Sequence, residues 1–317
     1  MAKKSILVLY YSQTGQLKRL VNSVISSLVN DDRFEITMEE ISSSEHFDFP
    51  WPFFKFFDAF PECVYMDAPP IIEPKANRKK YDLIILAYQV WFLSPSLPTT
   101  GLLQSDFAKD VFKDTPVITL IGCRNMWLMA QEKVKNILGE LKAKHIDNIA
   151  LIDRGGSLAN FITVTRWLLT GKKDKLWGIF PEPGISEKDI NEASRFGIAI
   201  KDSLIESEKP LDQSILKGYR AVTVDESLIF SEKTGHRMFK IWGRLLRKVA
   251  PRKSRKRYPF IVGFAVYLTL AIIMIVPVSM LIRKILSPFT KEKINKERKY
   301  FEAPSGNEDY KLLNKNG

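Results

Sequence analysis

A short polar loop follows the first apolar run of the chain. Its residues are Ser12, Gln13, Thr14, Gly15, Gln16 and Leu17. Hydroxyl groups, a glycine and the free N–H groups at the start of a helix together favour the binding of a phosphate group. The loop has neither the Gly-Lys-Ser/Thr ending of a Walker loop nor the three glycines of a dinucleotide fingerprint. An ordinary strand-to-helix turn is the alternative interpretation.

Two more groups of candidate ligand-binding residues stand at the ends of later apolar runs. They are Gln89, Val90, Trp91 and Phe92 after one run, and Gly122, Cys123, Arg124, Asn125 and Trp127 after the next. Aromatic faces stack on planar rings and exclude water from them. The catalytic candidates are Tyr88, Cys123 and Arg124, although Arg124 is equally suited to holding a carbonyl oxygen and a cysteine is more often a small packed residue.

The elements that position these loops are five short apolar runs with helices between them. The runs are Ser5–Tyr11, Phe34–Ile41, Tyr81–Tyr88, Thr115–Gly122 and Asn148–Ile152. Helices are expected from about Met126 to Lys144 and after Ser186, a plausible N-cap. This alternation predicts an α/β protein with a doubly wound parallel sheet, whose ligands bind beyond the carboxyl ends of the strands.

The first loop resembles the flavodoxin phosphate loop, whose pattern is Ser/Thr-x-Thr-Gly-x-Thr. Ser12, Thr14 and Gly15 match the pattern, and Leu17 replaces its final hydroxyl residue. The resemblance implies a flavodoxin-like fold with a five-stranded parallel sheet in the order 2-1-3-4-5. It also implies FMN as the cofactor, with the third-strand and fourth-strand loops on either side of the isoalloxazine ring.

A narrower resemblance covers three segments together with a basic, apolar C-terminal extension. LVLYYSQTGQL, YQVWFLSPSLP and GCRNMW are similar to the flavodoxin-like dialkylresorcinol condensing enzymes, which accompany ketosynthases in bacterial pigment synthesis. This resemblance implies oxidation of a lipid-like dialkylcyclohexane-1,3-dione to a resorcinol, with a ketosynthase as partner. The alternatives are an electron-transfer protein that serves a membrane partner, and a binding module that has lost its cofactor.

The run Phe260–Ile282 is uncharged and mostly apolar. About 20 apolar residues in a helix cross a hydrocarbon core of about 30 Å, so this run is long enough to span a membrane. A buried core helix is the alternative. Pro277 removes one helical hydrogen bond. The sequence therefore predicts a kinked single span and leaves open a re-entrant hairpin that returns both flanks to one side.

The charge distribution supports a membrane location. The net charge is +12, and residues 208–317 carry an excess of 13 Lys and Arg over Asp and Glu. A basic cluster precedes the apolar run: Arg244, Arg247, Lys248, Arg252, Lys253, Arg255, Lys256 and Arg257. A nucleic-acid surface is the alternative, but the neighbouring apolar run favours anionic lipids. We expect the α/β part to face the cytoplasm at the cytoplasmic membrane.

Composition divides the chain into four parts. We expect an FMN-binding domain over 1–207, a basic amphipathic connector over 208–257, a membrane segment over 258–284 and a polar tail over 285–317, disordered from about Lys291. Segments 46–70 and 155–183 are rich in aromatic residues, which suit either extra core packing or an apolar ligand surface. The two cysteines and three histidines form no cluster, so no metal site is expected.

Overall fold

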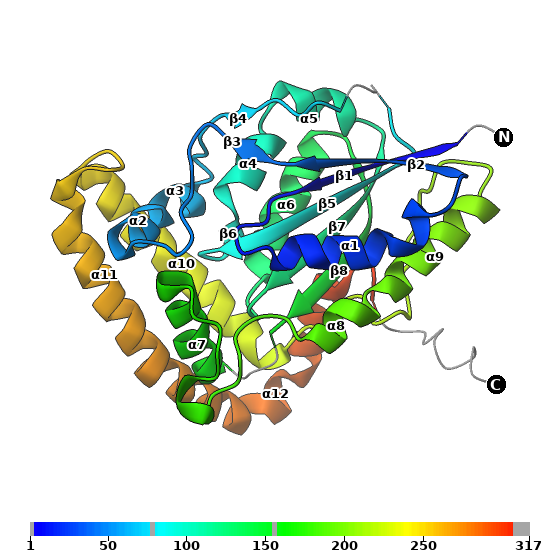
Figure 1. Cartoon of the computed structure of the whole chain (residues 1–317). Helices are drawn as coiled ribbons and strands as arrows, with labels where there is room; N and C mark the ends of the chain where they lie inside the picture. Colours follow the sequence, from blue (N-terminus) through cyan, green and yellow to red (C-terminus); the bar gives the residue numbers. More distant parts are fainter. Residues whose placement is uncertain (1–2, 77–79, 154–156, 307–317) are drawn as a thin grey trace.

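The computed structural model describes residues 3–76, 80–153 and 157–306 (Figure 1). Its central parallel strands are β1 Lys4–Tyr10, β2 Phe34–Glu40, β5 Leu83–Trp91, β7 Pro116–Cys123 and β8 Lys144–Ile152. They are ordered β2-β1-β5-β7-β8, and a short β6, Ser94–Pro95, pairs antiparallel with the end of β5. All five predicted strands form. When only these five are counted along the chain, their order in the sheet is 2-1-3-4-5, so the predicted flavodoxin-like α/β fold is confirmed.

Helices cover both faces of the sheet (Figure 1). One face carries α1 Gln16–Val29, α8 Glu187–Glu192 and α9 Ser194–Glu206, and the other carries α4 Leu97–Leu103, α5 Asp106–Val111 and α6 Leu128–Glu140. Helices α1 and α9 approach so closely that a Cβ at Gly197 would lie 1.8 Å from the Val24 carbonyl oxygen. The predicted N-cap of α8 is confirmed, because the Ser186 Oγ accepts a hydrogen bond from the Asp189 amide at 3.1 Å.

A second hydrophobic cluster lies beside the main core. It joins α2 Phe53–Asp58 and α3 Phe60–Tyr65 to α10 Glu226–Val249 and α11 Tyr258–Leu270. Its buried members are Phe57, Phe60, Val64, Leu93, Phe239, Leu246, Ile261 and Phe264. The aromatic segment 46–70 therefore supplies core packing. In segment 155–183, by contrast, Trp177 and Ile179 are 78% and 82% exposed.

The connector differs from the sequence expectation. The sequence predicts an amphipathic connector outside the FMN-binding domain, but Phe239, Trp242 and Leu246 of its helix α10 pack in the second cluster. The loop before it supplies Leu211, Leu216 and Val222 to the main core, so the core continues past residue 207.

The apolar run lies in the first part of a long bent helical segment. It comprises α11, a π-helical turn η3 at Ala271–Ile275, and α12 Val276–Glu302. The stretch Arg255–Met274 is long and apolar enough to cross a membrane, with 17% of its most apolar window buried. A helix to Glu302 also replaces the disordered tail expected from Lys291; residues 307–317 of that tail lie outside the described part of the chain.

The remaining elements lie around the carboxyl edge and in the connections. They are β3 Ser42–Ser43, β4 Ile71–Ile72, α7 Ser157–Thr170, η1 Leu176–Gly178 and η2 Arg255–Arg257. Of these, α7 follows β8 and so stands next to the loops that the sequence singles out.

Candidate functional site

Three loops meet at the carboxyl edge of the sheet. They follow β1, β5 and β7, which are neighbours in the strand order. The Gln13 amide approaches the Gln89 Oε1 at 3.5 Å, and the Tyr11 and Trp91 rings meet edge to face with centroids 5.8 Å apart. The strand order reverses at β1 and β5, and open α/β sheets bind their ligands at such a switch point.

The β1–α1 loop has the groups that a phosphate needs. Gly15 has a φ of +79° and caps α1, and a Cβ added there would meet nothing within 4 Å. The Ser12 hydroxyl accepts a hydrogen bond from the Lys18 amide at 3.1 Å. Within the described residues, the Thr14 hydroxyl and the amides of residues 15–17 have no hydrogen-bond partner. These donors at a helix start suit an anion.

Two side chains of this loop make contacts within the protein and do not face the proposed phosphate position. Leu17, which stands where the flavodoxin pattern has a hydroxyl, is 2% exposed and lies over Gly122 at the end of β7. The Gln16 side chain exchanges hydrogen bonds with the backbone of Ile185, with both distances at 3.1 Å. Leu17 and Gln16 therefore offer only their backbone amides to a phosphate.

The strand β5 is longer than the sequence predicted: it includes Gln89, Val90 and Trp91 and ends in a tight hairpin with β6. Its two turn residues, Phe92 and Leu93, have φ values of 50° and 58°, a left-handed conformation that costs non-glycine residues energy. Val90 pairs with Pro95 across the hairpin. Trp91 is half-buried, with its ring 5.2 Å from that of Phe47. Packing of the turn side chains in the second cluster offsets the strain and fixes Trp91 beside the β1 loop.

The loop after β7 contributes less than the sequence suggested. Trp127 is 2% exposed and packs in the main core, so it presents no free ring face. Arg124 and Asn125 are half-buried, and the Arg124 guanidinium lies 5.8 Å from the Phe161 ring centroid of α7. Burial lowers the pKa of Arg124, and the charge of Asp153 opposes this shift. Asp153, at the end of β8, was missed by sequence reasoning.

The surroundings of the other two catalytic candidates, Tyr88 and Cys123, indicate that both residues have structural roles. The Tyr88 side chain is fully buried and donates a hydrogen bond to the Gln131 Oε1 at 2.5 Å. Gln131 in turn donates to Thr119 at 2.9 Å. Burial raises the pKa of both the Tyr88 hydroxyl and the Cys123 thiol, so both hold their protons at neutral pH. Neither suits the role of proton acceptor.

A buried glutamate from α10 lies under the β7–α6 loop. Glu232 is 0% exposed, and its Oε1 accepts a hydrogen bond from the Met129 amide at 2.7 Å. Burial raises the pKa of Glu232 to about 8, although the hydrogen bonds from the amides of Met129 and Leu128 oppose the shift. Helix α6 has no cap from its own N-cap residue, so Glu232 caps it from 103 positions away.

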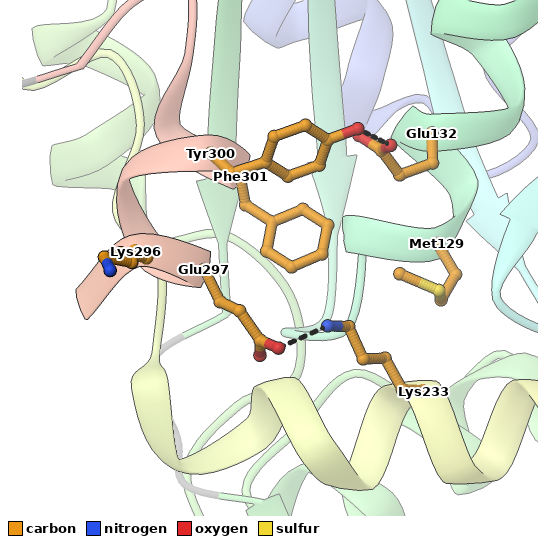
Figure 2. Close-up of a pocket in the computed structure, with 7 residues that line it drawn as sticks. All are labelled: Met129, Glu132, Lys233, Lys296, Glu297, Tyr300 and Phe301. Carbon is orange, nitrogen blue, oxygen red and sulfur yellow. Dashed lines mark hydrogen bonds and ion pairs between the residues drawn. The ribbon is translucent and has the colours of Figure 1, made fainter. Parts of the chain in front are cut away.

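One cavity in the structure has none of the candidate loop residues in its lining. It measures about 470 Å³ and opens between the first turns of α6, helix α10 and the end of α12. Figure 2 shows two pairs among its polar groups: Tyr300 donates to Glu132, and Lys233 pairs with Glu297. Lys296, which also lines the cavity, pairs with Glu292 at 2.9 Å. Among the described residues, no group of three or more His, Cys, Asp or Glu side chains could hold a metal ion.

Comparisons with known proteins find similarity in solved structures alone. No protein-family model matches the chain, and no curated protein sequence matches it. A flavoprotein in complex with FMN from Lactobacillus acidophilus is 22% identical, covering 46% of this chain and 92% of its own, with a TM-score of 0.38. A putative flavoprotein from Bacteroides eggerthii is 17% identical, covering 46% and 87%, with a TM-score of 0.35.

A third similar structure is a Fusobacterium nucleatum flavodoxin bound to flavin mononucleotide. It is 10% identical, covering 65% of this chain and 99% of its own, with a TM-score of 0.32. At these TM-scores the likenesses carry no argument about this chain. Its fold therefore rests on its own strand order.

Proposed function

We propose that the chain is a membrane-attached flavoprotein that binds FMN at the carboxyl ends of β1, β5 and β7. The observation that carries this proposal is the β1–α1 loop, where the Thr14 hydroxyl and the amides of residues 15–17 have no partner among the described residues. Trp91, which is half-buried, stands beside the same loop with its ring against that of Tyr11. These groups suit a phosphate with an aromatic ring system next to it.

Replacing the loop's phosphate-binding groups should abolish FMN binding. Thr14→Ala removes the free hydroxyl, and Gly15→Val places a β-branched residue at a φ of +79°. We expect the double variant to lose FMN affinity by more than tenfold, measured by flavin fluorescence on titration. Gly139→Ala is the matched control, because Gly139 is also exposed, and a Cβ there likewise meets nothing within 4 Å. Unchanged affinity in a folded double variant would place the phosphate elsewhere.

The chemistry we propose is oxidation of an alkylated cyclohexane-1,3-dione to its resorcinol. Bound FMN would supply the two-electron oxidation of the ring. Support for this substrate class comes from the resemblance to dialkylresorcinol condensing enzymes and from apolar surroundings. Trp91 touches Phe47 and Trp51, and this aromatic cluster continues through Phe56 to Phe92 in the second cluster. Arg124 is the charged group of the β7 loop suited to a substrate or cofactor carbonyl.

A stoichiometric reaction tests the proposed oxidation. FMN-loaded protein is mixed without oxygen with a synthetic dialkylcyclohexane-1,3-dione, and flavin absorbance and products are followed. We expect one resorcinol for each flavin reduced, because aromatisation removes two electrons and two protons from the ring. An apolar binding surface gains about 0.8 kcal/mol per buried methylene, so longer alkyl chains should react at lower concentrations. Loaded protein that gives neither bleaching nor resorcinol would favour the electron-transfer alternative.

A further inference from the structure

The segment between residues 257 and 297 leaves the α/β domain and returns to it. At its start, the Arg257 guanidinium is 1% exposed and donates hydrogen bonds to Asp58 at 3.1 Å and to Glu62 at 3.0 Å. The side chain also donates from Nε to the Ala250 carbonyl oxygen at 2.8 Å. The beginning of α11 is thus fixed to α2 and α3 by a buried ion-pair network.

The far end of the segment is fixed to the same domain. Lys233 of α10 pairs with Glu297 at 2.9 Å, and Phe301 is 3% exposed within the main core (Figure 2). Beyond α12, the Ser305 Oγ donates to the Asp147 Oδ1 and accepts from the Asn148 amide, both at 2.6 Å. Because Asp147 and Asn148 belong to β8, the chain after the apolar run is built into the sheet.

The apolar helix is also partly packed along its length. Ile261 and Phe264 of α11 are 0% exposed, and the Phe264 ring stacks on Phe60 with centroids 4.0 Å apart. A helix that crosses a bilayer alone would have lipid on all sides. Here one side of α11 belongs to the second cluster, and only the opposite side is free.

The free side and its ends have the pattern of a lipid-binding surface. Its large apolar residues are 45% to 62% exposed: Val262, Val266, Leu270, Ile273, Met274 and Val278. Exposed basic residues stand on both sides of the apolar run Phe260–Ile282: Arg255 and Lys256 before it, and Lys291, Lys293, Lys296 and Lys299 after it. Basic residues at both ends complement the anionic head groups of one membrane face.

We propose that this segment is a re-entrant wedge, with its bend at Ala271–Ile275 in the lipid and both flanks on the cytoplasmic face. Figure 1 shows α11 and α12 meeting at a corner while their far ends stay on the domain. A single span would place β8 and Ser305 on opposite sides of the membrane and break their contacts. The wedge rests on the proposed membrane attachment and replaces the single span expected from the sequence.

Cysteine labelling from each side of the membrane tests the wedge. Lys248→Cys and Lys293→Cys place exposed thiols before and after the apolar run Phe260–Ile282. The wild type, with Cys63 buried and Cys123 half-buried, gives the background. A membrane-impermeant maleimide is applied to spheroplasts and to inside-out vesicles, with detergent-opened membranes as the measure of full labelling. We expect both variants to reach at least tenfold higher labelling in inside-out vesicles than in spheroplasts.

The outcomes that would contradict the wedge differ from those that would contradict membrane attachment. Labelling of Lys293→Cys in spheroplasts, with Lys248→Cys labelled in inside-out vesicles alone, would show a single span and overturn the wedge while leaving membrane attachment intact. Recovery of the folded protein in the soluble fraction would overturn the attachment itself, and the wedge with it.

Discussion

Arg257→Ala is expected to destabilise the protein by about 3–5 kcal/mol, because it leaves two buried carboxylates without their partner. Asp58 and Glu62 are each 6% exposed, and Arg257 is the basic side chain that pairs with both. The loss should also release the start of α11 from the domain. The measurement is the free energy of unfolding from urea titration of the protein in detergent.

A charge-neutral triple variant is the control for Arg257→Ala. Arg257→Met combined with Asp58→Asn and Glu62→Gln removes all three charges and leaves no unpaired ion. Most of the lost stability should return, because replacement of a whole buried ion cluster is often close to neutral. A single variant as stable as the wild type would mean that the carboxylates reach water or another cation, contrary to the structure.

Glu232→Gln is expected to stabilise the protein at alkaline pH and to have little effect at pH 5. The pKa of Glu232 in the folded protein is raised to about 8, above the ordinary 4.5. Folding therefore disfavours the ionised form, so wild-type stability falls as the pH rises from about 5 to 8 and then levels off. The glutamine keeps an oxygen for the Met129 amide and has no proton to lose. The difference in unfolding free energy should grow to roughly 5 kcal/mol as an upper limit.

The comparison of Glu232→Gln with the wild type cancels the titration of other groups, such as the buried Asp147. Urea unfolding at pH 5, 7 and 9 gives the required curves. A stabilisation that is the same at all three pH values would show that Glu232 ionises normally, and that its surroundings are more hydrated than the structure shows.

The sheet was predictable because its strands are buried on both faces. Ile6–Leu9 and Leu83–Ala87 are continuous apolar runs with no exposed residue, which is typical of central parallel strands. The last strand was predicted too short, since β8 begins at Lys144 and includes the polar residues Asp147 and Asn148. Asp147 is buried because Ser214 and Ser305 donate to it, each at 2.6 Å, and partners so distant in sequence leave no local signal.

The candidate site was predictable in its position and less so in its side chains. Loop residues after β1, β5 and β7 had to meet, because parallel strands share one carboxyl edge. Whether Trp91 or Trp127 faces a ligand depends on packing from other elements, and Trp127 turned inward. Glu232 was missed for the same reason, since its place under the β7 loop depends on how α10 docks.

We propose that this domain holds FMN, and the identity of the bound cofactor tests this most directly. The full chain is purified in detergent and denatured, and any released flavin is identified by chromatography and mass spectrometry and counted per chain. We predict close to one FMN per chain in the wild type and in Gly139→Ala, and almost none in the Thr14→Ala, Gly15→Val variant. Folded wild-type protein that carries no flavin and takes up no added FMN would show that the domain is not an FMN-binding domain.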